Sequence, residues 1–303
     1  MSAALRRRRS GFTLLELILA LMIGLVVLTT ATAVTASTWQ SVRGSAIRDD
    51  VSRSARYIGV TLQRDVQETG VDLASSVDFG TLAVRNDTIV ILRVPYEPAP
   101  PGQYPLSQAN FANGVCGLTC VDIQTGGAVP QLSVGDLARV QVSNVRRLIY
   151  VTGVSPVNGG YRVTFANTPT LLQHDGGIQG LAINPASTFV QRLGTVVYWR
   201  ENGRFMRAVR LNPDLSLRGD AIATGVQALT ARLVFTDGSE AAQADAGTDG
   251  STVNDYDDIS GLRVQILLQG ERTDPGVNGG RPVQRQLQWW FAPRNLIYER
   301  NRQ

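Results

Sequence analysis

The pattern of apolar and polar positions divides the chain into a long apolar start and a mixed remainder. From Phe12 to Thr35 most residues are apolar, and no charged residue lies between Leu17 and Val42. At about 1.5 Å per residue, a helix over residues 12–35 is roughly 35 Å long, which exceeds the roughly 30 Å hydrocarbon core of a bilayer. The pattern therefore predicts a transmembrane helix over residues 12–35.

An amphipathic pattern continues over residues 36–70. Apolar residues recur there at steps of three to five, mostly four, which places them on one face of a helix. They are Trp39, Val42, Ile47, Val51, Ala55, Ile58, Leu62 and Val66. The other face is assigned Arg43, Arg48, Asp49, Arg53, Arg56, Arg64 and Asp65. Because no proline interrupts this stretch and Gly70 is a stop signal, we expect one continuous helix whose apolar face packs on a globular domain.

Residues 71–303 change to short apolar runs bounded by Gly, Asn, Pro and Asp, which is typical of strands and turns. The predicted strands are 82–85, 88–94, 137–142, 148–154, 161–166, 189–200, 205–211, 229–235, 262–268 and 284–291. Asn86-Asp87 predicts a hairpin between the first two. Alternation in the last strand sends Trp289 and Phe291 to one face and Trp290 to the other. The predicted fold class is α+β, a long amino-terminal helix on an antiparallel, mostly β domain.

The charges around the apolar run are unusual in one respect. Four arginines, Arg6 to Arg9, precede it and fix that end in the cytoplasm by the positive-inside rule. Glu16 lies inside its first turns, where an unpaired carboxylate costs at least a few kcal/mol in hydrocarbon. A secretory signal peptide has a shorter apolar core, and an ordinary membrane anchor accounts for the length and the arginines but leaves Glu16 unexplained.

The residues Gly11-Phe12-Thr13-Leu14-Leu15-Glu16, after a basic leader, closely resemble the processing site of type IV pilins. The resemblance implies that residues 1–11 are a leader peptide, that prepilin peptidase cuts between Gly11 and Phe12, and that Phe12 is then N-methylated. It also implies a role for Glu16 in subunit assembly. In a filament the Glu16 carboxylate would pair with the Phe12 ammonium of a neighbour, which neutralises both charges in an apolar bundle.

A looser resemblance concerns the carboxy-terminal part. Residues 225–229, 233–238 and 259–268, together with Arg294-Asn295-Leu296 and the helix end 62–66, are similar to PilW-type minor pilins. This implies a minor pilin that takes part in initiation of a type IV pilus, with other major and minor pilins and the inner-membrane assembly platform as partners. The alternatives are a J-type minor pseudopilin of type II secretion and a DNA-receptor subunit of a competence pilus. The expected location is the bacterial inner membrane, with the globular domain outside the cytoplasm, and then the filament.

The net charge of +4 gives little support to nucleic-acid binding. Loss of residues 1–11 removes four arginines and no acidic residue, so the 29 basic residues fall to 25 and equal the 25 acidic ones. After the leader, the sequence shows no basic run beyond Arg146-Arg147. A nucleic-acid partner is therefore left open.

The two cysteines, Cys116 and Cys120, are predicted to form a disulfide, because the compartment beyond the membrane is oxidising. Such a short loop should stabilise local structure more than the whole fold. An Asp-rich loop is a candidate calcium site, although a solvated acidic loop is the simpler interpretation; its carboxylates are Asp245, Asp249, Asp255, Asp257 and Asp258. No other cofactor is expected. We predict no enzyme activity, since His174 is the only histidine and no nucleophile motif occurs.

Overall fold

The computed structural model describes residues 13–77, 79–96, 101–107, 116, 119–143, 145–167, 181–212, 216–245, 254–275 and 277–296. The chain divides into two compact units. The first contains Met1–Asp50 and Arg272–Val283, and the second contains Val51–Glu271 and Gln284–Gln303.

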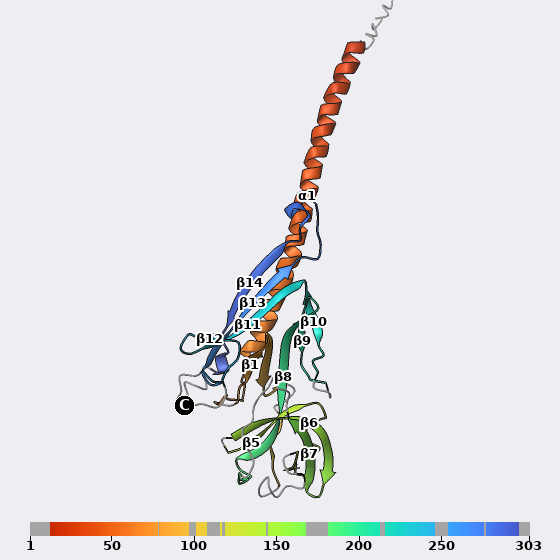
Figure 1. Ribbon diagram of the computed structural model, residues 1–303. Helices are drawn as coiled ribbons and strands as arrows, with labels where there is room; N and C mark the ends of the chain where they lie inside the picture. Colours follow the sequence, from red (N-terminus) through yellow and green to blue (C-terminus); the bar gives the residue numbers. More distant parts are fainter. Residues whose placement is uncertain are drawn as a thin grey trace, which may run out of the picture. The chain divides into compact units, whose positions relative to one another are not determined.

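The first element, α1 (Leu14–Gln67), is a single helix of 54 residues (Figure 1). At about 1.5 Å per residue its length is about 80 Å. Gly70, at φ +72°, follows its end and donates its N–H to the carbonyl of Leu92. The amide of Asn295 also donates to the carbonyl oxygens of Gln67 and Thr69, at 3.1 and 3.2 Å. The bond to Gln67 satisfies a carbonyl that the helix end leaves unpaired, and the other two bonds hold the residues that follow the helix.

The predicted apolar face of α1 is buried only in part. Ile47, Val51, Ala55, Ile58, Leu62 and Val66 are buried, whereas Trp39 and Val42 are 61 % and 56 % exposed. The prediction that this face packs from Trp39 onward is therefore wrong for its first two members. The assignment of Asp65 to the polar face is also wrong, since Asp65 is 2 % exposed. It lies three residues after Leu62 and seven after Ile58, which places it on the buried side of the helix.

A ten-stranded antiparallel sheet has the main order β1-β2-β8-β5-β6-β7-β4; β3 and β9 also pair with β8, and β10 pairs with β9. Its strands are β1 (Leu82–Arg85), β2 (Thr88–Arg93), β3 (Tyr104–Pro105), β4 (Cys120–Gln124), β5 (Leu137–Val142), β6 (Val145–Val157), β7 (Gly160–Asn167), β8 (Thr188–Glu201), β9 (Arg204–Ala208) and β10 (Asp220–Thr224). Asn86 and Asp87, at φ +47° and +57°, make the tight turn between β1 and β2, so the hairpin prediction is confirmed.

A four-stranded antiparallel sheet has the order β12-β11-β13-β14. Its strands are β11 (Val226–Phe235), β12 (Glu240–Ala241), β13 (Ile259–Gln269) and β14 (Gln284–Phe291). In β14, Phe291 is buried, Trp289 is half-buried against the core and Trp290 is 58 % exposed. The predicted alternation of these aromatic side chains is confirmed. A short 3₁₀ turn (Asn278–Gly280) lies in the connection from β13 to β14.

The buried residues form two clusters rather than one core. The larger joins the buried face of α1 to strands of both sheets. The smaller is built from β4 to β7 and the first part of β8 and includes Val121, Val140, Ile149 and Val163. Strand β8, 14 residues long, contributes to both, so it connects the two halves of the ten-stranded sheet (Figure 1). The α+β prediction, a long helix on an antiparallel β domain, is confirmed.

Several strand boundaries differ from the prediction. Strand β9 ends at Ala208 instead of 211, because the chain turns away there and Leu211 forms a bridge with Leu217. Strands β3, β4, β10 and β12 were not predicted. They are two to five residues long, which is too short for a clear alternation of apolar and polar residues.

Candidate functional site

The first turn of α1 begins at Thr13 and contains Glu16. The Thr13 Oγ1 accepts a hydrogen bond from the N–H of Glu16 at 3.3 Å and donates to its carboxylate at 3.5 Å. Thr13 thus stands at the N-cap and Glu16 at the third helical position, the Thr-x-x-Glu spacing of a capping box. This spacing is visible in the sequence as Thr13-Leu14-Leu15-Glu16. The backbone N–H of Glu16 is thus capped by Thr13, and the Glu16 carboxylate lies near the same hydroxyl.

The predicted cleavage residues, Gly11 and Phe12, lie outside the described residues. Glu16 is described, and its side chain is exposed, as are its neighbours along the helix. Glu16 thus lies in the exposed first turn of α1, close in sequence to the predicted cleavage point between Gly11 and Phe12.

The apolar surface of α1 is uncovered along its first half. The large apolar side chains from Leu14 to Leu28 are between 43 % and 78 % exposed. Within the described residues, α1 is the only helix long and apolar enough to cross a membrane. Exposed apolar surface of this extent is costly in water, so lipid or neighbouring helices must cover it.

Hydroxyl side chains follow this apolar segment without leaving unpaired groups. Each donates to a backbone carbonyl three or four residues earlier in the helix. They belong to Thr29, Thr30, Thr32, Thr35, Ser37 and Thr38. Because their donors are satisfied within the helix, these residues are compatible with an apolar environment.

A buried polar network anchors the last turns of α1 to the sheet. The Asp65 carboxylate accepts a hydrogen bond from the Tyr198 hydroxyl of β8 and a charged one from Arg207 Nε of β9, at 2.8 Å. Arg207 Nε also lies 3.1 Å from the Tyr198 hydroxyl. Burial, and then the hydrogen bond and charge of Asp65, raise the pKa of Tyr198 above its usual range. Burial by itself would lower the pKa of Arg207, but the hydrogen bond and charge of Asp65 outweigh it and raise that pKa.

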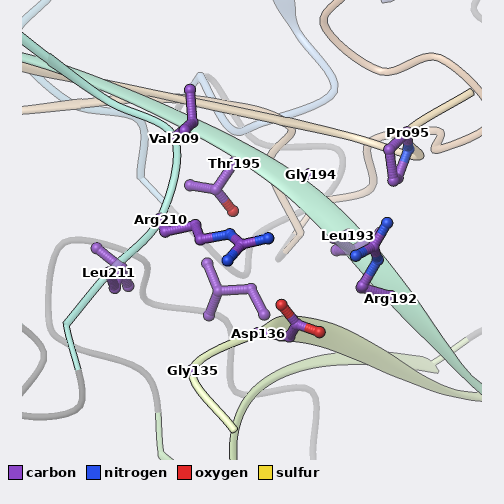
Figure 2. A pocket seen from close by; sticks show the side chains of 11 residues that line it. Pro95, Gly135, Asp136, Arg192, Leu193, Gly194, Thr195, Val209, Arg210 and Leu211 are labelled. Carbon is purple, nitrogen blue, oxygen red and sulfur yellow. The ribbon is translucent and has the colours of Figure 1, made fainter. Parts of the chain in front are cut away.

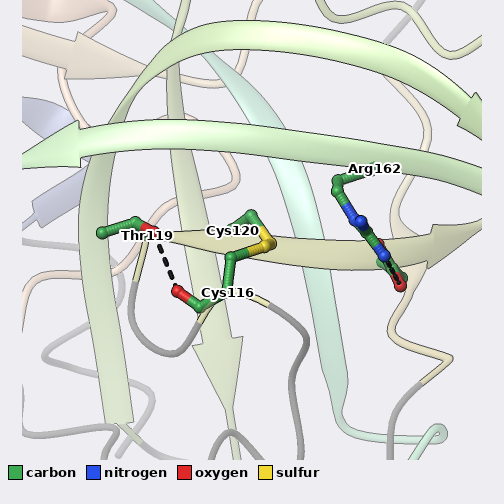
Figure 3. Close-up of a disulfide and its surroundings, with 5 residues drawn as sticks. Cys116, Thr119, Cys120 and Arg162 are labelled. Atoms are coloured by element: carbon green, nitrogen blue, oxygen red, sulfur yellow. Dashed lines mark hydrogen bonds and ion pairs between the residues drawn. A yellow bond between two sulfur atoms is a disulfide. The ribbon is translucent and has the colours of Figure 1, made fainter.

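The predicted disulfide is present between Cys116 and Cys120, whose Cα atoms are 5.5 Å apart (Figure 3). The Thr119 hydroxyl donates to the Cys116 carbonyl across the same loop at 2.8 Å. Two residues along β4, Asp122 forms a bidentate ion pair with Arg162 of β7, at 2.7 and 2.9 Å. The disulfide therefore closes a tight loop at the start of a strand that is also held by this cross-strand pair.

The structure brings together three of the five predicted calcium ligands. Ligand oxygens of Asp255, Asp257 and Asp258 all lie within 4.8 Å of one another, whereas Asp245 is not in this group and Asp249 lies outside the described residues. Asp255 is 3 % exposed. Burial, then the hydrogen bond and charge of Asp257, raise the pKa of Asp255 to about 7. Calcium binding stays a prediction, which calorimetric titration of the purified protein measures.

The single candidate catalytic residue considered in the sequence, His174, lies outside the described residues. The prediction that the chain is not an enzyme therefore stays a prediction.

Comparison with known proteins bears on the amino-terminal segment. The family model for the prokaryotic N-terminal methylation motif matches residues 6–32. No curated protein matches the chain significantly. The matched range contains the arginines, Gly11, Phe12, Glu16 and the first part of α1. The chain thus carries a prepilin-type N-terminal methylation motif, continuous with an exposed apolar helix that is long enough to span a bilayer.

Proposed function

We propose that this chain is a minor pilin of a type IV pilus that takes part in initiating filament assembly. The single observation that carries the proposal is the methylation motif at residues 6–32, which runs directly into the exposed apolar half of α1. We propose that prepilin peptidase cuts between Gly11 and Phe12, and that α1 passes from the inner membrane into the helical core of a filament. The protein would then be the substrate of an enzyme and not an enzyme itself. Other major and minor pilins and the assembly platform are its proposed partners.

The physical basis of assembly is the exchange of lipid for neighbouring helices around α1. Apolar side chains gain little from this exchange, because lipid tails are as apolar as the helices that replace them. A charge pair in the apolar bundle is different, since it is favourable only in the correct axial register. Glu16 and the α-ammonium created at Phe12 supply such a pair, so the proposed role of Glu16 is to fix the register between subunits.

The capping contact gives a competing explanation for Glu16, and substitutions can separate the two. Glu16→Gln removes the charge but keeps a side chain that can cap the helix, since glutamine also serves at this position of a capping box. Thr13→Val removes the capping hydroxyl and keeps the charge. Glu16→Ala removes both functions. The quantity to measure is the amount of subunit in sheared filaments relative to the amount in the membrane fraction.

If the charge sets the register, Glu16→Gln and Glu16→Ala should each lower incorporation about tenfold or more, equivalent to at least about 1.4 kcal/mol. Thr13→Val should retain most of the incorporation, because a lost cap costs only about 1 kcal/mol of helix stability. Membrane insertion should be normal in all three variants. Wild-type incorporation of Glu16→Gln, together with loss in Thr13→Val, would show that Glu16 acts only as a helix cap and would contradict the proposed pairing.

A further inference from the structure

A pocket of about 150 Å³ opens in the second unit beside the middle of β8 (Figure 2). It lies where the strand pairing along one edge of β8 is interrupted. Strand β5 pairs with β8 up to Leu193, and β9 pairs with the same edge from Val197 onward. Neither strand pairs with residues 194–196 on this edge, so the two strand ends part and leave a space between them.

The chain leaves β8 on both sides of this gap for identifiable reasons. Before β5, Gly135 at φ +95° donates its N–H to the Val151 carbonyl, and Val151 donates to the Asp136 carbonyl, so residues 135–136 pair with β6 instead of β8. After β9, the Asn212 carbonyl accepts a hydrogen bond from the Tyr150 hydroxyl at 2.9 Å. On both sides of the gap, these bonds pair the neighbouring segments with groups outside β8.

Unpaired donors line this space. Arg192 Nε and Thr195 Oγ1 are buried and have no hydrogen-bond partner among the described residues. Figure 2 shows the guanidinium of Arg210 reaching into the middle of the pocket, with the Asp136 carboxylate below it. No ion pair among the described residues involves Arg192 or Arg210. Buried donors without acceptors are costly, so a bound acceptor would stabilise this arrangement.

The charge and the walls of the pocket narrow the type of ligand. Arg192 and Arg210 line the pocket together with one carboxylate, that of Asp136, which already accepts the Ser133 N–H at 2.9 Å. The lining therefore carries a net positive charge and favours a monoanion. Three buried leucines form an apolar wall of the same pocket; they are Leu137, Leu193 and Leu211. A space of about 150 Å³ holds a small ligand of a few non-hydrogen atoms.

We propose that this pocket binds a small organic carboxylate with a short apolar chain. The carboxylate oxygens accept from the Arg210 guanidinium and the Thr195 hydroxyl, and the chain lies against the leucines. Arginine suits this role because its planar fork of donors matches the two oxygens of a carboxylate. The inference is independent of the filament role, since it concerns the globular part alone.

Sodium butanoate is the probe for a test on the full-length protein in a non-denaturing detergent. Saturation-transfer NMR during a titration should show saturable butanoate binding, whereas butylammonium, with the same chain and the opposite charge, should not bind. Inorganic phosphate should compete more weakly than butanoate, because it gains nothing from the apolar wall.

Arg210→Gln is the main variant, because Arg210 is exposed and its loss should leave the fold intact. It should weaken butanoate binding about tenfold, the loss expected for one charge-assisted hydrogen bond. Thr195→Val, nearly identical in shape, should also weaken binding. Arg232→Gln, an exposed arginine on β11, is the matched control and should bind as the wild type does. Absence of saturable butanoate binding, equal binding of butylammonium, or equal affinities of Arg210→Gln and the control would each overturn the proposal and leave a water-filled gap.

Discussion

Replacing Asp65 by asparagine should destabilise the protein although the change is small in volume. The carboxylate is 2 % exposed on α1 and is bonded to Tyr198 and Arg207 of the sheet. Asparagine keeps an oxygen that can accept one of these hydrogen bonds. It removes the negative charge, however, and leaves the Arg207 guanidinium without a counter-ion.

The expected loss of stability follows from the burial of the Asp65–Arg207 ion pair. Loss of one partner of a buried ion pair typically costs about 3–5 kcal/mol. The Arg207 side chain keeps 27 % of its surface exposed, so water retains part of its solvation. We therefore expect Asp65→Asn to lower the free energy of unfolding by about 2–3 kcal/mol. Arg207→Gln should cost at least as much, because the carboxylate that it leaves unpaired is the more deeply buried partner.

A double-mutant cycle tests whether the pair itself is responsible. Denaturant unfolding of the detergent-solubilised protein can be followed by the fluorescence of Trp199 and Trp289, which are buried and half-buried. The double variant Asp65→Asn/Arg207→Gln should be more stable than the sum of the two single losses predicts, by about 1–3 kcal/mol. Additive losses, or a cost of Asp65→Asn below about 0.5 kcal/mol, the range of ordinary surface substitutions, would refute the reasoning.

Three further predictions concern the globular part. Gly59→Ala should cost about 1–2 kcal/mol in denaturant unfolding, because the added Cβ would lie 2.9 Å from Trp289 Nε1; unchanged stability would show that the indole moves freely. The raised pKa of Asp255, about 7 in the folded state against about 4 unfolded, means that the folded state holds the extra proton, so stability should fall as pH rises from 4 to 7. Asp255→Asn should make the stability nearly independent of pH between 4 and 7, and an unchanged slope in that range would contradict the assignment of the raised pKa to Asp255. Replacing Cys116 and Cys120 by serine should lower the free energy of unfolding by at most about 2 kcal/mol, because the disulfide closes a loop of only five residues. A fall in melting temperature that corresponds to a larger loss would contradict the view that this disulfide stabilises only its own loop.

The long helix and most strands could be predicted because their patterns repeat over many residues. The 3.6-residue period of α1 and the alternation in β14 each depend on local sequence only. Burial at the edges of a pattern could not be predicted in the same way. Whether Trp39 is covered depends on which distant segment reaches it, and the periodicity of the helix contains no such information.

The burial of charged residues could not be predicted from the local sequence. A charged residue within a helix or strand is normally assigned to solvent, as Asp65 was. Arg139 of β5 is likewise only 6 % exposed. It donates to the Gln191 side chain at 2.7 Å and to the Asp72 carbonyl at 3.4 Å, and burial, then the charge of Arg146, lower its pKa to about 10. These partners lie 52 or more residues away in sequence, so only the fold reveals them.

The methylation motif at the amino terminus could be recognised from the sequence, because it is local. Gly11, Phe12 and Glu16 lie within six consecutive residues. What the sequence analysis missed there, the contact between Thr13 and Glu16, was also local and followed from the capping-box spacing. The pocket beside β8 is the opposite case. Arg192 belongs to β8 and Arg210 to the segment that follows β9, and the gap that they both line depends on where β5 and β9 leave β8.

The most direct test of the central claim is mass spectrometry of the amino terminus of the protein purified from its native membrane. The account predicts a chain that begins at Phe12, lacks residues 1–11 and carries one additional methyl group on its α-amino nitrogen. A chain that still begins with its arginine-rich leader, or one from which the whole apolar segment to about residue 35 has been removed, would contradict it.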